Sequence, residues 1–318
     1  MWIDGTVEAM DGPVRVRETS LHGRIHGESR RSTLGAAPDL MYGTTQMKEL
    51  DISTKNCIVE QDGNVLIVTL NRPEAKNAFS PEMLLGMYKA WRLLDDDDDL
   101  YCAILTANGD TFCAGMDLKA GADGQQRSTE EFMEVMGRVP NVHWQALLRD
   151  NRPNKPLILA VEGYALAGGT EILQGTDIRV AAENAVFGVT EVARGLYPMS
   201  GSTVRLRRQI PYCVAAEMLL CGEHISAQRA LEIGLINRIV PPGETLAAAR
   251  EYAAKICANG PLAVKAVIRS LREHQECMAE EDAMVASDEL AVPVFASADA
   301  KEGMRAFKEK RPAKFSGK

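Results

Sequence analysis

Val161-Glu-Gly-Tyr-Ala-Leu-Ala-Gly-Gly-Thr-Glu-Ile-Leu-Gln-Gly-Thr-Asp177 is the most informative segment of the sequence, because in it a glycine-rich turn leads into a helix. It follows the short apolar run Pro156 to Ala160, which has the length and composition of a buried strand. Ala167-Gly168-Gly169 then brings bare backbone to the start of the helix, where a ligand can approach closely. Unpaired N–H groups and a partial positive charge at that end of a helix stabilise an anion or a developing oxyanion.

Glu171 lies three residues beyond Gly168, so we expect it one helical turn along and over the same spot. A polarising N–H group and a carboxylate within one turn suit chemistry next to a carbonyl group. The alternative is a glycine turn that opens an ordinary helix whose glutamate faces water. Taken alone, the segment favours this alternative, so the choice between a catalytic and a solvent-facing Glu171 depends on motifs elsewhere in the chain.

Strands and helices alternate on both sides of this segment. Cys57 to Leu70 contains two strand candidates around a turn, and Tyr101 to Ala107 is a further buried strand. Ser80-Pro81 begins a helix in the favoured order of cap and proline. Further helices are expected over 128–148, from Ser202 through Ile210 and over 227–233, and further strands over 178–181 and 235–240.

The periodicity becomes helical throughout beyond Glu244, with helices expected over 245–258, 261–274, 279–295 and 298–310. Strand–helix alternation followed by helices alone predicts an α/β core with an α-helical appendage. Residues 1–48 have no periodic apolar face, and we interpret them as a mobile N-terminal extension, or as an upstream extension ahead of a functional start near Met47. The predicted organisation is therefore an extension (1–48), a catalytic core (49–243) and a C-terminal helical region (244–318).

Composition excludes several classes of function. The 318 residues carry a net charge of −8, so a global basic field for nucleic acid is absent. No apolar run approaches the length needed to cross a membrane. Seven cysteines without a C-x-x-C pair fit free thiols in a reducing compartment, so we predict a cytoplasmic protein.

Motifs for bound nucleotides, metal ions or a Ser-His-Asp triad do not occur in the sequence. The five aspartates at 95–99 cannot converge on one ion, and the histidines show no ligand spacing, so no metal is expected. What remains is two glycine turns, Ala114-Gly115-Met116-Asp117 and Ala167-Gly168-Gly169, and two carboxylates, Glu171 and Glu191. Two N–H donors from separate loops would make an oxyanion hole, and two carboxylates would make an acid–base pair.

At these residues the sequence resembles the enoyl-CoA hydratase/isomerase (crotonase) family, from about Cys57 to the C-terminus. Seven segments occur in the family's order, and together they are specific although each alone is weak. They are Asn71-Arg-Pro with Asn77-Ala, Phe112 to Leu118, Gly163 to Glu171, Asp177 to Ala182, Phe187-Gly with Glu191, Ala230 to Val240, and Asp299 to Lys310-Arg. The resemblance implies an α/β fold, a spiral of ββα units with a C-terminal α-helical trimerisation region.

The resemblance also implies an acyl-CoA substrate and assigns the site. Glu171 and Glu191 match the two catalytic glutamates, and the N–H groups of Met116 and Gly168 match the oxyanion hole. The positions that would bind CoA are Ala75, Ala114, Met116, Asp117, Leu118, Lys119 and Gly168, with Phe307 and Lys310 reaching the CoA of a neighbouring subunit. No cofactor is implied beyond CoA as part of the substrate, and the expected assembly is a homotrimer or a dimer of trimers.

We therefore predict an enoyl-CoA hydratase, which adds water across the 2,3 double bond of a 2-enoyl-CoA. The alternatives are a Δ3,Δ2-enoyl-CoA isomerase, in which one glutamate moves a proton, and a non-catalytic acyl-CoA-binding member. Retention of both glutamates favours the hydratase. The sequence departs from many hydratases at Ala167, where they have a glycine, and a positive φ there would be costly for an alanine.

Overall fold

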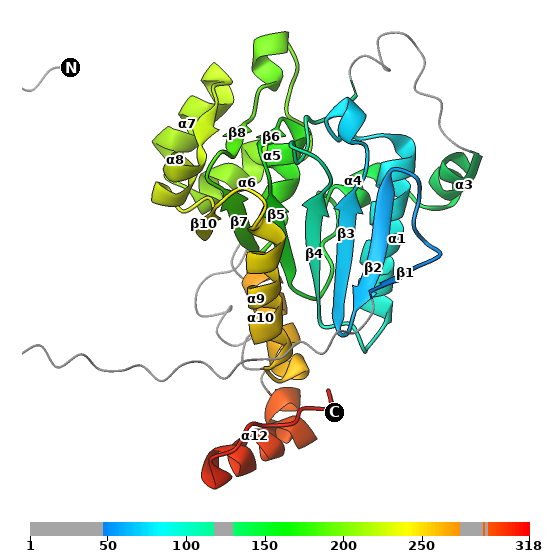
Figure 1. Ribbon diagram of the computed structural model, residues 1–318, viewed down its shortest axis with the longest axis vertical. Coiled ribbons are helices and arrows are strands. Elements are labelled where there is room, and N and C mark those ends of the chain that lie inside the picture. Colours follow the sequence, from blue (N-terminus) through cyan, green and yellow to red (C-terminus); the bar gives the residue numbers. More distant parts are fainter. Residues whose placement is uncertain (1–46, 118–129, 274–288, 290–291) are drawn as a thin grey trace, which may run out of the picture. The chain divides into compact units, whose positions relative to one another are not determined.

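The computed structural model describes residues 47–117, 130–273, 289 and 292–318. Its main element is a seven-stranded sheet (Figure 1). In spatial order the strands are β1 (Lys48–Glu49), β2 (Cys57–Asp62), β3 (Val65–Leu70), β4 (Cys102–Ala107), β5 (Leu157–Val161), β7 (Ile178–Ala182) and β10 (Arg238–Val240). Antiparallel pairing joins β1 to β2 and β2 to β3, and all later pairs are parallel.

Strand β3 shows why the central strands are apolar at every position. Leu66, Val68 and Leu70 belong to one hydrophobic cluster, whereas Val65 and Ile67 belong to a second one on the opposite face. Helix α1 (Pro81–Asp96) covers the first face and α9 (Thr245–Cys257) the second. Because helices cover both faces of a parallel sheet, its strands are apolar in continuous runs rather than in alternation.

A second, smaller sheet contains β6 (Tyr164–Leu166), β8 (Val186–Gly188) and β9 (Ile225–Ser226). Twice in succession the chain passes from the large sheet to the small one and then into a helix. Strands β5 and β6 lead to α5 (Gly168–Leu173), and β7 and β8 lead to the 3-10 helix η2 (Glu191–Arg194). The predicted spiral of ββα units is confirmed.

Several local predictions are confirmed in detail. Cys57–Leu70 forms the hairpin of β2 and β3. The hydroxyl of Ser80 accepts a hydrogen bond from the Met83 N–H and caps α1, with Pro81 as its first residue. Ser226 caps α8 (Ala227–Glu232) in the same way, through the Arg229 N–H. Three further helices of the described core are η1 (Pro73–Ala75), α6 (Ser202–Gln209) and α7 (Tyr212–Cys221).

Two expected boundaries differ from the observed ones by more than one residue. The single helix expected over 128–148 is two helices, α3 (Glu130–Arg138) and α4 (Val142–Ala146). Pro140 lies between them, and Asn141 has a left-handed backbone with φ 55°, which no helix interior accepts. The last strand begins at Arg238 rather than at Leu235.

The elements that the structure describes beyond Glu244 are helices, as predicted, and residues 311–318 after them are irregular. It contains α9, α10 (Pro261–Glu273) and α12 (Ala298–Glu309). Most of the helix expected over 279–295 lies outside the described residues, as do residues 1–46 of the predicted extension. No helix in the described part of the chain is long and apolar enough to cross a lipid bilayer.

Candidate active site

The turn before α5 carries the first of the two predicted oxyanion donors. The amide of Gly168 opens α5, and the first N–H groups of a helix have no partner within it. Ala167, directly before it, has φ 50° and ψ −122°, a conformation that costs a residue with a Cβ about 1–3 kcal/mol. The Ala167 N–H is held by the carbonyl of Gly188 at 2.8 Å. The small sheet thus holds the strained turn from which the Gly168 N–H begins α5.

The second donor lies on the turn after β4. The carbonyl of Gly115 accepts a hydrogen bond from the Phe79 N–H at 2.8 Å. In a trans peptide the C=O and the following N–H point in opposite directions, so the Met116 N–H points away from Phe79. The Gly115 N–H donates to the sulfur of Cys113 at 3.3 Å. Burial raises the pKa of that thiol to about 12, so Cys113 stays neutral and supports the turn.

The two turns lie against each other. A methyl group added to Gly115 would lie 2.8 Å from the Ala167 Cβ and 3.2 Å from the Gly168 nitrogen. A methyl group on Gly169 would lie only 2.5 Å from the Cys113 carbonyl oxygen. Glycine is therefore required on both sides of the contact, and Gly115 also has φ +90°. The turn that precedes Met116 therefore lies in direct contact with the turn that carries Gly168.

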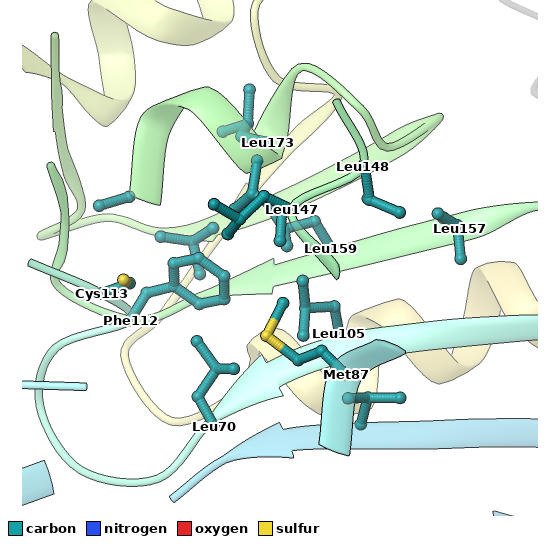
Figure 2. Packing of buried hydrophobic residues seen from close by; sticks show 14 of the residues in the cluster. Leu70, Met87, Leu105, Phe112, Cys113, Leu147, Leu148, Leu157, Leu159 and Leu173 are labelled. Atoms are coloured by element: carbon teal, nitrogen blue, oxygen red, sulfur yellow. The ribbon is translucent and has the colours of Figure 1, made fainter. Parts of the chain in front are cut away.

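Glu171 is only 2% exposed, which excludes the alternative of a solvent-facing glutamate. Its Oε1 accepts a hydrogen bond from the Ser202 N–H at 3.2 Å, at the start of α6. The Ser202 hydroxyl in turn accepts from the side-chain amide of Gln174 at 2.8 Å. Ile172 and Leu173 anchor α5 in the core, where Figure 2 shows Leu173 directed into the cluster that contains Phe112. Core packing of Ile172 and Leu173 therefore fixes α5, and the Ser202 N–H holds the carboxylate of Glu171.

Glu191 begins η2, and its Oε2 is buried without a hydrogen-bond partner among the described residues. Burial raises the pKa of this carboxyl group to about 7, with a further contribution from the negative charge of Glu171. Arg194 lowers it slightly. The structure therefore brings both predicted carboxylates together, and Glu191 is half protonated near neutral pH.

The predicted CoA-binding turns also meet. The Ala114 N–H donates to the carbonyl of Lys76 at 3.0 Å, which joins the Met116 turn to the loop at Ala75. Arg72 pairs with Asp117 at 2.8 Å, and both side chains are largely buried. The side-chain amide of Asn77 donates to two backbone carbonyls, at Asn108 and Thr111. These contacts give the surface beside the two glycine turns a fixed shape.

The structure does not test the other predicted CoA contacts, which stay predictions. Leu118 and Lys119 lie outside the described residues, as does the side chain of Phe307. Helix α12 was expected to reach Lys310 but ends at Glu309. Lys310 follows the helix with a left-handed φ of 53°.

Sequence reasoning missed the residues that hold Glu171. Ser202 and Gln174 are both fully buried, and the backbone carbonyl of Gln174 accepts from Gln209 at 2.9 Å. Arg179, also buried, donates to the Gln209 side chain at 2.9 Å. Polar residues at otherwise apolar positions near α5 and α6 were the sequence feature that could have indicated this hydrogen-bond network.

Within the described ranges no group of three or more metal-ligating side chains occurs, and the absence of a cofactor stays a prediction.

Comparison with known proteins gives consistent matches over the described fold. The sequence profile of the family described as enoyl-CoA hydratase/isomerase matches residues 60–318. The enoyl-CoA hydratase EchA19 of Mycobacterium tuberculosis is 52% identical over 266 residues, covering 84% of this chain and 98% of that protein. The 2,3-dehydroadipyl-CoA hydratase of Escherichia coli is 34% identical, covering 82% and 98%. A crystal structure of an enoyl-CoA hydratase from M. tuberculosis superposes with a TM-score of 0.75 at 43% identity, covering 83% and 100%.

Proposed function

The chain belongs to the enoyl-CoA hydratase/isomerase family and is an enoyl-CoA hydratase, and we propose that Glu171, Glu191 and the amides of Met116 and Gly168 perform the reaction. The observation that carries this proposal is the pairing of the buried carboxyl group of Glu171 with the partly buried one of Glu191, whose pKa is raised to about 7, beside two glycine turns in contact with each other. The substrate is a 2-enoyl-CoA thioester, and water is added across its 2,3 double bond.

The amides of Met116 and Gly168 bind the thioester oxygen. Negative charge accumulates on this oxygen when a nucleophile adds at C3, because the double bond is conjugated to the carbonyl group. Two fixed N–H donors stabilise that charge more than they stabilise the uncharged substrate, and one such donor typically contributes roughly 3–4 kcal/mol. The strained Ala167 and the tight contact at Gly115 support this assignment, since both orient the donors before substrate arrives.

The carboxyl groups divide the proton transfers between them. Glu171 accepts a proton from water while the water oxygen bonds to C3. Glu191, protonated up to about pH 7, delivers its proton to C2 as the charge returns from the thioester oxygen. The sum is one water added, and a proton must then pass from Glu171 to Glu191 to restore the starting state. The Ser202 N–H keeps Glu171 in place throughout.

Large exposed side chains follow Glu191 and support a role in binding the acyl group. Leu196, Tyr197 and Met199 are 47%, 67% and 54% exposed. Apolar side chains left exposed together mark a binding surface. We assign them to the acyl chain because they follow the carboxylate that acts at C2. The CoA portion would lie along Ala75, Ala114 and Asp117, continuing over Leu118 and Lys119.

A homotrimer or a dimer of trimers is the assembly we propose, with Phe307 and Lys310 beside the CoA of a neighbouring subunit. Exposed apolar side chains on the C-terminal helices support this, since isolated chains rarely leave so many in water. They are Val267, Leu271, Val292, Phe295 and Met304. Native mass spectrometry would give the stoichiometry, and a monomer at micromolar concentration would disprove the assembly.

We also propose a cytoplasmic location, which the six described free thiols support.

The function is tested by incubating the enzyme with crotonyl-CoA and, separately, with a 3-enoyl-CoA, and identifying the products by mass. A hydratase converts crotonyl-CoA into a product heavier by one water. An isomerase converts the 3-enoyl-CoA without change in mass and faster than it hydrates crotonyl-CoA. Only the first outcome agrees with two cooperating carboxyl groups.

A further inference from the structure

The hydroxyl group of Thr170 has no part in the proposed mechanism, although it is fully buried next to a proposed catalytic residue. Thr170 is the third residue of α5, directly before Glu171. Its Oγ1 donates a hydrogen bond to the carbonyl of Ala165 in β6, at 2.5 Å, and accepts one from the N–H of Gly188 in β8, at 3.0 Å. One hydroxyl group therefore joins α5 to two strands of the small sheet.

These hydrogen bonds differ from the usual ones of a threonine in a helix. A threonine hydroxyl normally donates to the carbonyl three or four residues earlier. Thr176, just after α5, does so through the Leu173 carbonyl, at 2.7 Å. The Thr170 hydroxyl instead reaches five residues back, to a carbonyl outside the helix. Because burying a hydroxyl is costly unless it is hydrogen-bonded, and a valine has the same shape, core packing alone does not explain a threonine at this position.

Gly188 holds the glycine turn Ala167-Gly168-Gly169 (the Gly168 turn) on both sides. At the start of the turn, the Ala167 N–H donates to the Gly188 carbonyl at 2.8 Å. Directly after the turn, the Thr170 hydroxyl accepts from the Gly188 N–H. Gly188 is also the last paired residue between β6 and β8, opposite Leu166. The backbone of one residue in β8 therefore fixes both ends of the strained turn.

Gly188 also determines where Glu191 lies, because only two buried residues separate them. A shift of Gly188 relative to the Gly168 turn would therefore move Glu191 as well. The packing around Gly188 is tight, since a methyl group added to it would lie 2.8 Å from the His224 side chain. The Thr170 hydroxyl thus connects the Gly168 turn to the segment that leads to Glu191.

We propose that Thr170 is a positioning residue, whose hydroxyl group keeps the Gly168 turn in register with Glu191. This role rests on the proposed function, in which the Gly168 amide binds the thioester oxygen and Glu191 delivers a proton to C2. The thioester oxygen and C2 are both bonded to the same carbon atom, so the donor and the acid have to be placed together. Binding of the CoA portion does not need this register, so loss of the hydroxyl should lower kcat rather than raise KM.

Steady-state hydration of crotonyl-CoA by Thr170→Val and Thr170→Ser tests this role. Valine keeps the shape and removes both hydrogen bonds, so we expect kcat at least about tenfold lower, with KM within about twofold of the wild type. Serine keeps the hydroxyl and should retain kcat within about threefold. If the valine variant does not fold, Thr170→Ala and Thr170→Ser give the same comparison, because they differ only in the hydroxyl group. Equal kcat with and without the hydroxyl would overturn the proposal.

The matched control is Thr176→Val, which removes a similarly buried hydroxyl that also donates one hydrogen bond and accepts one. Its partners are Leu173 of α5 and Arg179 of β7, rather than the small sheet. The control should lower Tm, as Thr170→Val does, but keep kcat within about twofold of the wild type. An equal loss of kcat in the control would show that any buried hydroxyl near α5 has this effect, and would overturn the assignment to Thr170.

Infrared difference spectra of bound butyryl-CoA, isotopically labelled at the thioester carbonyl carbon, give a measurement that needs no turnover. This saturated thioester cannot be hydrated, and hydrogen bonds to its carbonyl oxygen lower the C=O stretching frequency. We expect a clear lowering in the wild type, in Thr170→Ser and in Thr176→Val, and a smaller one in Thr170→Val. An equal lowering in Thr170→Val would refute the role of Thr170 alone. No lowering in the wild type would refute the oxyanion donors of the proposed function, and the role of Thr170 with them.

Discussion

The carboxyl groups of Glu171 and Glu191 lie close enough to interact, and burial together with the charge of Glu171 raises the pKa of Glu191 to about 7. This relationship supports the proposed roles, in which Glu171 is the base and Glu191 the acid. Glu171 is held in its place by the Ser202 N–H, whereas the buried Oε2 of Glu191 has no partner among the described residues. Pairs of titratable groups with such unlike surroundings are typical of acid–base catalysis.

The first prediction concerns the pH dependence of hydration. Because Glu191 has to donate a proton, kcat/KM for crotonyl-CoA should fall above about pH 7 as this group ionises. Glu171→Gln removes the neighbouring charge, so the pKa of Glu191 should decrease. Carbon NMR of labelled glutamate would follow the titration in both proteins. An unchanged titration in the variant would show that the two groups do not interact.

The second prediction concerns stability. The pKa of Glu191 is about 7 in the folded chain against an ordinary 4.5, so the folded state binds this proton more tightly than the unfolded state does. Stability from this group is therefore complete below about pH 4.5 and is lost as the pH rises through 7. Glu191→Gln avoids that loss. Its Tm should exceed that of the wild type more at pH 8 than at pH 5, and a constant difference would contradict the raised pKa.

The third prediction concerns the strained turn. Ala167→Gly relieves a positive φ but adds freedom to the unfolded chain, and the net effect should be a stabilisation of about 1 kcal/mol. Ala165→Gly, in β6, has no such strain to relieve and should destabilise the chain by a similar amount. Denaturant unfolding of both variants compares them. Destabilisation by Ala167→Gly would mean that the strain is absent.

The fourth prediction concerns the contact between the two turns. Gly115→Ala places a methyl group 3.2 Å from the Gly168 nitrogen, so the oxyanion donors should shift and kcat/KM should drop at least about tenfold. Gly63→Ala is the matched control, because Gly63 also has a positive φ but has no atom within 4 Å of the added methyl. It should lose stability and keep its activity. Equal activity in the two variants would refute the close approach.

The fifth prediction concerns the support of Glu171. Gln174→Leu removes the amide that donates to Ser202, but it also removes a buried Oε1 that has no partner in the described part of the chain. We expect stability within about 1 kcal/mol of the wild type, with kcat lowered and KM nearly unchanged. Gln228→Leu, exposed on α8, is the control. A change in KM alone would argue against a positioning role.

The large sheet was predictable because its strands are continuous apolar runs with clear turn and cap signals. Val65–Leu70 and Ser80-Pro81 are examples. The small sheet was not, because β6, β8 and β9 have two or three residues each and are stabilised by pairing with one another rather than by local preference. The break at Pro140 was readable in principle, but the apolar spacing on both sides resembled one helix.

In the site, too, residues encoded in short segments were predictable, whereas residues whose role depends on tertiary packing were not. Glu171, Glu191 and the two glycine turns were predicted, since each is encoded in a short segment. Ser202 and Gln174 were not, because their role depends on α6 packing against α5, which no local pattern reports. The strain at Ala167 likewise follows from the hydrogen bond to Gly188 in a neighbouring strand.

Hydration of crotonyl-CoA by Glu171→Gln and Glu191→Gln tests the paired-carboxylate mechanism most directly. Each substitution keeps the side chain's size and removes its ability to transfer a proton, and Glu183→Gln serves as an exposed control. The paired mechanism predicts at least about a hundredfold lower kcat in both variants, with acyl-CoA binding retained and the control unaffected. Near-normal turnover in either variant would contradict it.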